Sequence, residues 1–102
     1  MSDSYTRIMK AFGKTLKAAR LQAGFSSAQK FAEMMGIEPA TYRYYERGGS
    51  EPGLETLLRI CAALGITMND LFQQTATKSH TLIDALKAAQ RRKHHSIPSS
   101  ES

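Results

Sequence analysis

Apolar residues recur along most of this chain at the three- and four-residue spacing of an α-helix, and no stretch alternates as a half-buried strand would. The first such set is spaced by four, four, three and four positions, which predicts a helix over about residues 5–23. Its members are Ile8, Phe12, Leu16, Ala19 and Ala23. Gly24 follows, a residue type that commonly ends a helix in the left-handed conformation. The pattern therefore predicts an all-α fold that begins with a long helix.

Capping residues and helix breakers divide the next segment into two short helices. Ser26 or Ser27 can cap a second helix that ends near Met35, before Gly36. The residues of this helix that we expect to face inward are Ala28, Phe31, Ala32 and Met35. Proline suits the first turn of a helix, so a third helix is predicted over about residues 39–47.

Two further helices are predicted after Pro52-Gly53. A stripe of apolar residues indicates the fourth helix, which closes at Gly65. The stripe consists of Leu54, Leu57, Leu58, Cys61 and Leu64. Thr67 and Asp70 have the spacing of a capping box, in which each side chain accepts a hydrogen bond from the other residue's backbone amide. We therefore expect a short fifth helix to begin there.

The end of the chain differs in composition from the part before it. Residues 73–78 are polar or small and predict a linker, and helical spacing over about residues 81–93 predicts a possible sixth helix. We expect a helical domain over residues 1–75. A linker with a possible C-terminal helix over 76–95 and a disordered, Ser-rich tail over 96–102 would follow.

Composition is that of one ordinary globular domain, with 102 residues of which 41% are hydrophobic and 23% charged. No run approaches the ~18 apolar residues that a membrane span needs, and the amino end has no secretory signal pattern. Cys61 is the single cysteine and cannot form an internal disulfide, which suits a reducing compartment. We expect a cytoplasmic protein in which Cys61 is a small core residue.

The net charge of +5 is unevenly distributed along the chain. Residues 1–75 hold nine basic and seven acidic residues, a difference of two. Residues 76–102 hold five basic and two acidic residues, a difference of three. Because the tail supplies over half of the excess, overall basicity is weak evidence for nucleic-acid binding. Evidence for such binding has to come from local pattern.

The second and third predicted helices are short and closely joined at Gly36, which is typical of a helix-turn-helix. In such a unit the second helix of the pair lies in the major groove of DNA. Tyr42 and Tyr45 share the inward face of that helix. The outer face consists of Ala40, Arg43, Tyr44 and Arg47, with Thr41 at its margin. From periodicity alone, this face suits DNA readout and an ordinary solvated surface equally well.

Individual side chains on the outer face have chemistry that suits base readout. Arg43 could form a bidentate contact with guanine O6 and N7, worth ~1–3 kcal/mol of discrimination. Ala40 or the methyl group of Thr41 could meet a thymine methyl group. Tyr44 could contact a phosphate or stack on a sugar.

The stretch from Leu16 to Phe72 resembles the Cro/CI helix-turn-helix family, also called XRE or lambda-repressor-like DNA-binding domains. The matching blocks, in order, are LKAARLQAG at 16–24, FAEMMGI at 31–37, ATYRYYERG at 40–48, PGLETLLRICAALGI at 52–66 and NDLF at 69–72. The resemblance implies a five-helix domain and a sequence-specific, double-stranded-DNA-binding transcriptional regulator, most simply a repressor.

The resemblance also implies roles for individual residues. The family's helix-1 arginine falls on Arg20 and its helix-3 glutamate on Glu46, which in relatives pair across the domain. The base-reading positions fall on Pro39, Ala40, Thr41, Arg43 and Tyr44. The phosphate-contacting positions fall near Lys17, Ser27, Gln29 and Arg47.

Three features depart from the family pattern. One residue more than usual lies between Gly24 and Ala32, which alters the turn between the first two helices. Ala28 occupies the position of a common glutamine, with Gln29 beside it. Glu38 stands before the third helix where Ser or Thr is usual. Its carboxylate would favour the helix N-terminus and repel a nearby phosphate, or could accept a hydrogen bond from cytosine N4.

Two functional hypotheses follow. In the first, a homodimer places two reading helices in successive major grooves, ~34–36 Å apart, on a near-palindromic operator. In the second, the chain is a protein-interaction module, such as an antitoxin or adaptor, that binds a protein partner through the helix over 81–93. The apolar stripe of that helix could equally contact a second copy or dock on its own domain. Its residues are Leu82, Ile83, Leu86 and Ala89.

The sequence gives no indication of an enzyme, a cofactor, a metal site or a membrane contact. The three histidines lack companion cysteines or carboxylates at metal-ligand spacing. No Gly-rich phosphate loop or placed Ser/His/Asp set is present. The basic run over residues 91–95 suits the C-terminal end of a helix and is a solvated charge run or a contact to DNA backbone.

Overall fold

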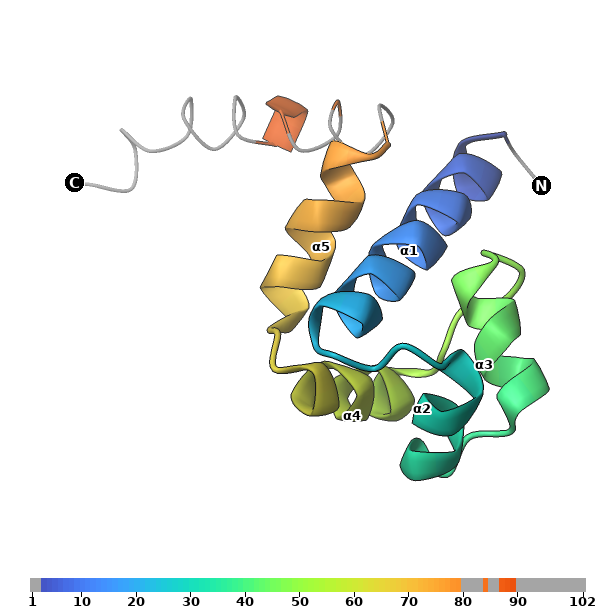
Figure 1. Cartoon of the computed structure of the whole chain (residues 1–102). Helices are drawn as coiled ribbons and strands as arrows, with labels where there is room; N and C mark the ends of the chain where they lie inside the picture. The colour runs from blue at the N-terminus through green and yellow to red at the C-terminus, as the bar shows by residue number, and fades with distance from the viewer. Residues whose placement is uncertain (1–2, 80–83, 85–86, 90–102) are drawn as a thin grey trace.

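The computed structural model describes residues 3–79, 84 and 87–89 of the chain. These residues form helices and no strands, so the predicted all-α class is confirmed. The helices are α1 (Asp3–Gln22), α2 (Ala28–Met35), α3 (Pro39–Glu46), α4 (Leu54–Leu64) and α5 (Met68–Thr77). In Figure 1, α5 lies beside α1, and α2, α3 and α4 lie below and beside them. Within the described residues, no helix combines the length and apolar character that a membrane crossing requires.

Side chains that cap helices set several of these boundaries. Ser27 caps α2, because its hydroxyl oxygen accepts a hydrogen bond of 3.1 Å from the amide of Lys30. Thr67 and Asp70 form the predicted capping box of α5, with reciprocal hydrogen bonds of 2.9 and 3.1 Å. Gly36 ends α2 in the left-handed region, at φ 73°. Of the two serines that could cap the second helix, the structure uses the second.

An aromatic cluster forms the centre of the core. Phe31 of α2 and Tyr42 of α3 are almost fully buried, and their ring centroids lie 5.3 Å apart in an edge-on arrangement. Phe25 packs on Phe31 at 4.9 Å, and Tyr45 packs on Tyr42 at 6.2 Å. Such tilted arrangements suit the charge distribution of aromatic rings. Aliphatic side chains from α1 and α4 complete the cluster, namely Leu16, Ala19, Ile60 and Leu64.

Three of the predicted core positions are exposed instead. Ala23 lies beyond the end of α1 and faces solvent. Leu54 and Leu58 of α4 are 68% and 49% exposed. The buried face of α4 is Leu57 (in part), Ile60, Cys61 and Leu64. The prediction for α4 was wrong because leucines occupy two faces of this helix, so spacing alone selected a stripe that includes both.

Helix α5 continues through residues that were predicted to form a linker. It ends at Thr77, so residues 73–77 are helical. The physical reason is burial: Thr75 and Ala76 are 5% and 2% exposed where α5 packs along α1. Asp84 and residues 87–89 are helical as well. The rest of the helix predicted over 81–93, and the predicted tail over 96–102, lie outside the described residues.

Helices α1 and α3 approach each other backbone to backbone at two glycines. A Cβ atom added at Gly13 would collide with the carbonyl oxygen of Glu46, at the last turn of α3, and lie 2.8 Å from its carbonyl carbon. A Cβ atom at Gly48 would lie 2.8 Å from the carbonyl oxygen of Met9. Only glycine permits so close an approach. The C-terminal end of α3 is therefore fixed against the first half of α1.

We expect Gly13→Ala to lower the free energy of unfolding by about 1–3 kcal/mol, because the added methyl group forces α1 and α3 apart. This loss outweighs the gain of about 1 kcal/mol that alanine brings to a helix interior. Urea unfolding followed by circular dichroism measures the difference. Gly53→Ala is the control, since its Cβ atom meets open space, and its cost should stay below about 1 kcal/mol. Unchanged or raised stability of Gly13→Ala would contradict the close contact.

Candidate nucleic-acid interface

Helices α2 and α3 pack on each other and form a helix-turn-helix unit, in which α3 has two distinct faces. Tyr42 and Tyr45 are 0% and 9% exposed and anchor one face in the core. The other face is at the surface and carries Ala40, Thr41, Arg43, Tyr44 and Arg47. Hydrogen-bonding groups, an aromatic ring and two cations thus share one exposed surface, which can meet a polar, anionic partner.

Tyr44 is held at the C-terminal end of that face. The guanidinium carbon of Arg47 lies 5.5 Å from the centre of the Tyr44 ring, within cation–π range. Gly49 lies directly against the ring, where any side chain would collide with it. Tyr44 is still 48% exposed. Arg47 and Gly49 therefore both contact Tyr44, while Ala40 and Thr41 lie a turn earlier on the helix.

The N-terminal end of α3 begins at Pro39, which is partly buried. Glu38 precedes it, is exposed and makes no capping hydrogen bond with its side chain. A carboxylate at this position is favoured by the partial positive charge of the helix N-terminus. The start of the exposed face therefore combines a rigid proline with a free acceptor group.

The residues that the family resemblance assigns to phosphate contacts lie on three elements. The Ser27 hydroxyl accepts a hydrogen bond as the cap of α2 and keeps its own hydrogen to donate. The Gln29 side-chain amide donates to a carboxylate oxygen of Glu33 at 3.3 Å, which leaves its second N–H for another acceptor. Lys17 on α1 and Arg47 after α3 are both exposed.

A buried ion pair joins α1 to α3. Nε of Arg20 donates to Oε2 of Glu46 at 2.7 Å, and Nη2 donates to Oε1 at 3.2 Å. Nη1 donates to the carbonyl oxygen of Phe25 at 2.6 Å, in the turn between α1 and α2. The side chains of Arg20 and Glu46 are only 4% and 8% exposed. The hydrogen bonds to Glu46 raise the pKa of Arg20, so its charge is permanent.

Tyr42 packs beside this pair. Its hydroxyl group is buried and has no hydrogen-bond partner among the residues that the structure describes. Burial raises the pKa of Tyr42 well above its usual value, and the neighbouring Glu46 carboxylate raises it further. The hydroxyl group therefore stays neutral and adds no second negative charge next to Glu46.

Comparison with known proteins identifies this arrangement. A family model described as helix-turn-helix matches residues 16–71, which is more than half of the chain. The chain belongs to this family. The resemblance to Cro/CI-type helix-turn-helix proteins that the motifs indicate is thereby confirmed.

One relative of this helix-turn-helix chain is named as a transcriptional regulator. It is 38% identical over 64 residues to YonR, an SPbeta prophage-derived uncharacterized HTH-type transcriptional regulator of Bacillus subtilis strain 168. That match covers 63% of this chain and 58% of YonR, so the chain spans somewhat over half the length of this relative.

Solved structures of the clp gene regulator ClgR from Corynebacterium glutamicum share the fold. One has a TM-score of 0.64 at 28% identity, covering 70% of this chain and 90% of ClgR. Another has a TM-score of 0.63 at 28% identity, covering 91% of this chain and 93% of ClgR. The predicted five-helix domain type is thereby confirmed.

The family motifs did not indicate a row of cations on α1 of this helix-turn-helix domain. Arg7, Lys10 and Lys14 continue from Lys17 along one exposed helix face. In the described part of the chain, none of them pairs with a carboxylate. The backbone of Lys10 lies close to Gly48, which follows Arg47. Arg7, Lys10 and Lys14 also line a surface hollow together with Lys78 and Asp84. The spacing of three, four and three residues is the signal that could have revealed this row.

Cys61 is buried in the core, as predicted, with its sulfur 3.7 Å from the Met68 sulfur. Burial and, to a lesser extent, Asp70 raise the pKa of this thiol, which keeps it protonated and poorly nucleophilic. Within the described residues, no three metal-binding side chains come together.

We expect Glu46→Ala to lower the free energy of unfolding by about 3–5 kcal/mol, because it leaves the Arg20 charge buried and unpaired. Arg20→Met should cost a similar amount for the reciprocal reason. The double variant Arg20→Met/Glu46→Leu should lose much less than the sum of the single losses, since it leaves no buried charge. Urea unfolding of the four proteins measures the coupling. Additive losses in the double variant would show that the two side chains do not interact.

Proposed function

We propose that this chain is a sequence-specific, DNA-binding transcriptional regulator that acts as a repressor and reads a double-stranded operator with α3 in the major groove. The observation that carries the proposal is the two-sided character of α3. Tyr42 and Tyr45 anchor it in the core, while Arg43 and Thr41 face outward. An α-helix fits the major groove of B-DNA. Membership of the helix-turn-helix family and the named regulators among its relatives support the proposal.

In this proposal each exposed residue of α3 has a distinct role. Arg43 makes a bidentate contact with guanine, and Ala40 and Thr41 provide apolar contacts to a thymine methyl group. Pro39 sets the approach of the first turn toward the bases. Tyr44, held by Arg47 at 5.5 Å, contacts the bases or sugars at the other end of the site.

Phosphate contacts on both sides of α3 position the reading helix. Ser27 and Gln29 present hydrogen-bond donors at the first turn of α2, where the helix N-terminus also favours an anion. Lys17 and Arg47 supply charge. The remaining cations of the α1 row, Arg7, Lys10 and Lys14, would extend these contacts along the DNA backbone.

We also propose that two copies bind together on a near-palindromic site. Their reading helices would then lie ~34–36 Å apart, one turn of B-DNA. The exposed leucines of α4, Leu54 and Leu58, lie one turn apart and offer apolar surface for contact between copies.

Selection of bound sequences from a random duplex pool, at near-physiological salt, tests the function and the roles of two arginines. We expect the wild-type chain to enrich a two-fold-symmetric motif. Arg43→Ala should relax the preference at specific positions by about 5- to 150-fold, the loss of ~1–3 kcal/mol per bidentate contact. Arg47→Ala should instead weaken binding to all sequences evenly. Equal losses on all sequences in both variants would contradict these roles, and no enrichment by the wild type would contradict the function.

The contribution of the α1 row is measured by the salt dependence of DNA affinity. We expect Lys10→Gln/Lys14→Gln to reduce the slope of log K against log salt by up to about 2, since each phosphate contact contributes about 0.9. The loss should be the same for operator and unrelated DNA, because phosphates carry no sequence. Lys10→Arg/Lys14→Arg keeps the charge and should keep the slope. An unchanged slope in the glutamine variant would place this row away from DNA.

A further inference from the structure

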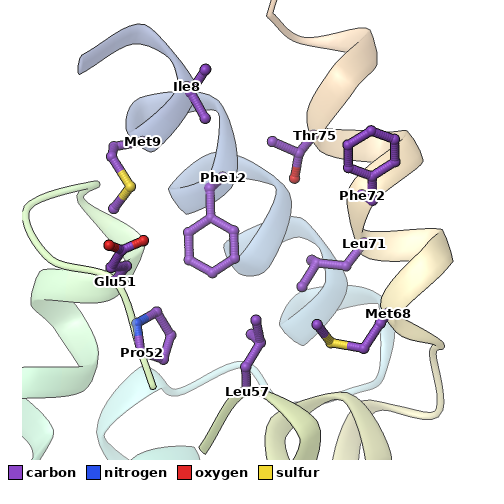
Figure 2. Close-up of a pocket in the computed structure, with 10 residues that line it drawn as sticks. All are labelled: Ile8, Met9, Phe12, Glu51, Pro52, Leu57, Met68, Leu71, Phe72 and Thr75. Atoms are coloured by element: carbon purple, nitrogen blue, oxygen red, sulfur yellow. The ribbon is translucent and has the colours of Figure 1, made fainter. Parts of the chain in front are cut away.

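An apolar pocket lies on the side of the domain formed by α1, α5 and the loop that follows α3. Its volume is about 330 Å³, at the lower end of the range of small-molecule sites. Figure 2 shows it bounded by Ile8 and Phe12 of α1, Leu57 of α4, and Leu71 and Phe72 of α5. None of the residues that would contact bases in the proposed function lines it. The pocket is therefore separate from the proposed DNA interface.

One buried polar group in this pocket lacks a partner. Thr75 is 5% exposed, and its hydroxyl oxygen makes no hydrogen bond with any part of the chain that the structure describes. Figure 2 shows this oxygen directed into the space between α1 and α5. A buried hydroxyl group without a hydrogen bond is unfavourable, and such groups in native proteins usually have a partner. The position of Thr75 thus indicates a missing hydrogen-bonding partner inside an otherwise apolar space.

The negative charge of Glu51 at the rim of the pocket limits which ligands can enter. Glu51, in the loop between α3 and α4, lies on the opposite side of the pocket from Thr75, and its side chain is exposed. Among the lining residues that the structure describes, Glu51 carries the one formal charge. An anionic ligand would therefore be repelled on entry, whereas a neutral molecule would not.

We propose that this pocket binds a small, neutral, largely apolar molecule whose single hydroxyl-type group bonds to Thr75. The walls bury the apolar part of the ligand. The Thr75 oxygen has almost no accessible surface in this structure, so the side chain has to rotate toward the ligand to form this bond. It can then donate to an oxygen of the ligand or accept from its O–H group, since a hydroxyl group does both. Because Glu51 and Pro52 belong to the segment that leaves α3, the bound molecule contacts the connection to the reading helix.

Three probes of one shape test the proposal: benzyl alcohol, toluene and benzoate. A benzene ring fits an apolar cavity of about 150 Å³, so all three fit by size. They are titrated into the full ¹⁵N-labelled chain and followed by amide chemical shifts. We expect saturable shifts around Phe12, Leu57 and Leu71 with benzyl alcohol. Its affinity should exceed that of toluene by about 5- to 10-fold, the usual worth of one hydrogen bond. Benzoate should bind most weakly.

Two variants locate the hydrogen bond. Thr75→Val has nearly the same shape and removes the unpartnered hydroxyl group, so the fold should be kept. It should still bind toluene and lose the preference for benzyl alcohol. Thr77→Val is the matched control on the same helix, because the Thr77 hydroxyl group is exposed and donates to the Gln74 carbonyl oxygen at 2.8 Å. This control should keep the wild-type preference.

The proposal fails under any of three results. Absence of saturable shifts with every probe would show that the pocket does not take a small molecule. Shifts that map to α2 and α3 rather than to α1 and α5 would place binding elsewhere. The same ratio of benzyl alcohol to toluene affinity in wild type and Thr75→Val would remove Thr75 from the site. Each result is independent of whether the chain binds DNA.

Discussion

The buried ion pair between Arg20 and Glu46 is the contact on which the position of α3 depends. Its guanidinium group donates twice to the carboxylate and once to the Phe25 carbonyl oxygen. One side chain of α1 therefore fixes α3 and the turn that leads into α2. A lysine ammonium group could not form these planar, forked contacts. Because desolvation offsets much of the attraction in such a pair, its main contribution is geometric rather than a large net gain in stability.

The surroundings of the pair also fix the turn between α1 and α2. Phe25 lies in this turn, accepts a hydrogen bond from Arg20 through its backbone and packs on Phe31 through its ring. This turn is thus held at two points, through its backbone and through its aromatic side chain. Arg59 adds a further constraint, since it donates to the Met35 carbonyl oxygen at 2.6 Å and holds the end of α2 against α4.

Much of the fold could be predicted from sequence because local signals and helical spacing agreed. Gly36, Ser27 and the Thr67–Asp70 capping box act within one turn, so the sequence alone places them. The rotation of α4 could not be predicted, since leucines lie on two of its faces and only contact with the rest of the core decides between them. The last turn of α5 was missed for a related reason. Its polar residues favour a helix only weakly, and packing of Ala76 beside α1 supplies the rest.

The candidate site likewise has features that could be predicted from the sequence and features that could not. The outward face of α3 follows from helical spacing, and the family motifs pointed to the partnership of Arg20 with Glu46, 26 positions apart. Contacts that depend on side-chain conformation could not be predicted. The stacking of Arg47 on Tyr44 and the hydrogen bond from Gln29 to Glu33 are of this kind. Both contacts change the orientation of an exposed side chain, but they do not change which side chains are exposed.

The glycine contact between α1 and α3 has a consequence for how such a domain diversifies. No side chain lies between Gly13 and the end of α3, so no side-chain exchange at this contact can tilt α3. The exposed residues of α3 take no part in this contact or in the aromatic core. If α3 reads DNA as proposed, exchange of these surface residues would change the preferred sequence while the helix keeps its position. Target choice and structural integrity would then depend on separate residues of this chain.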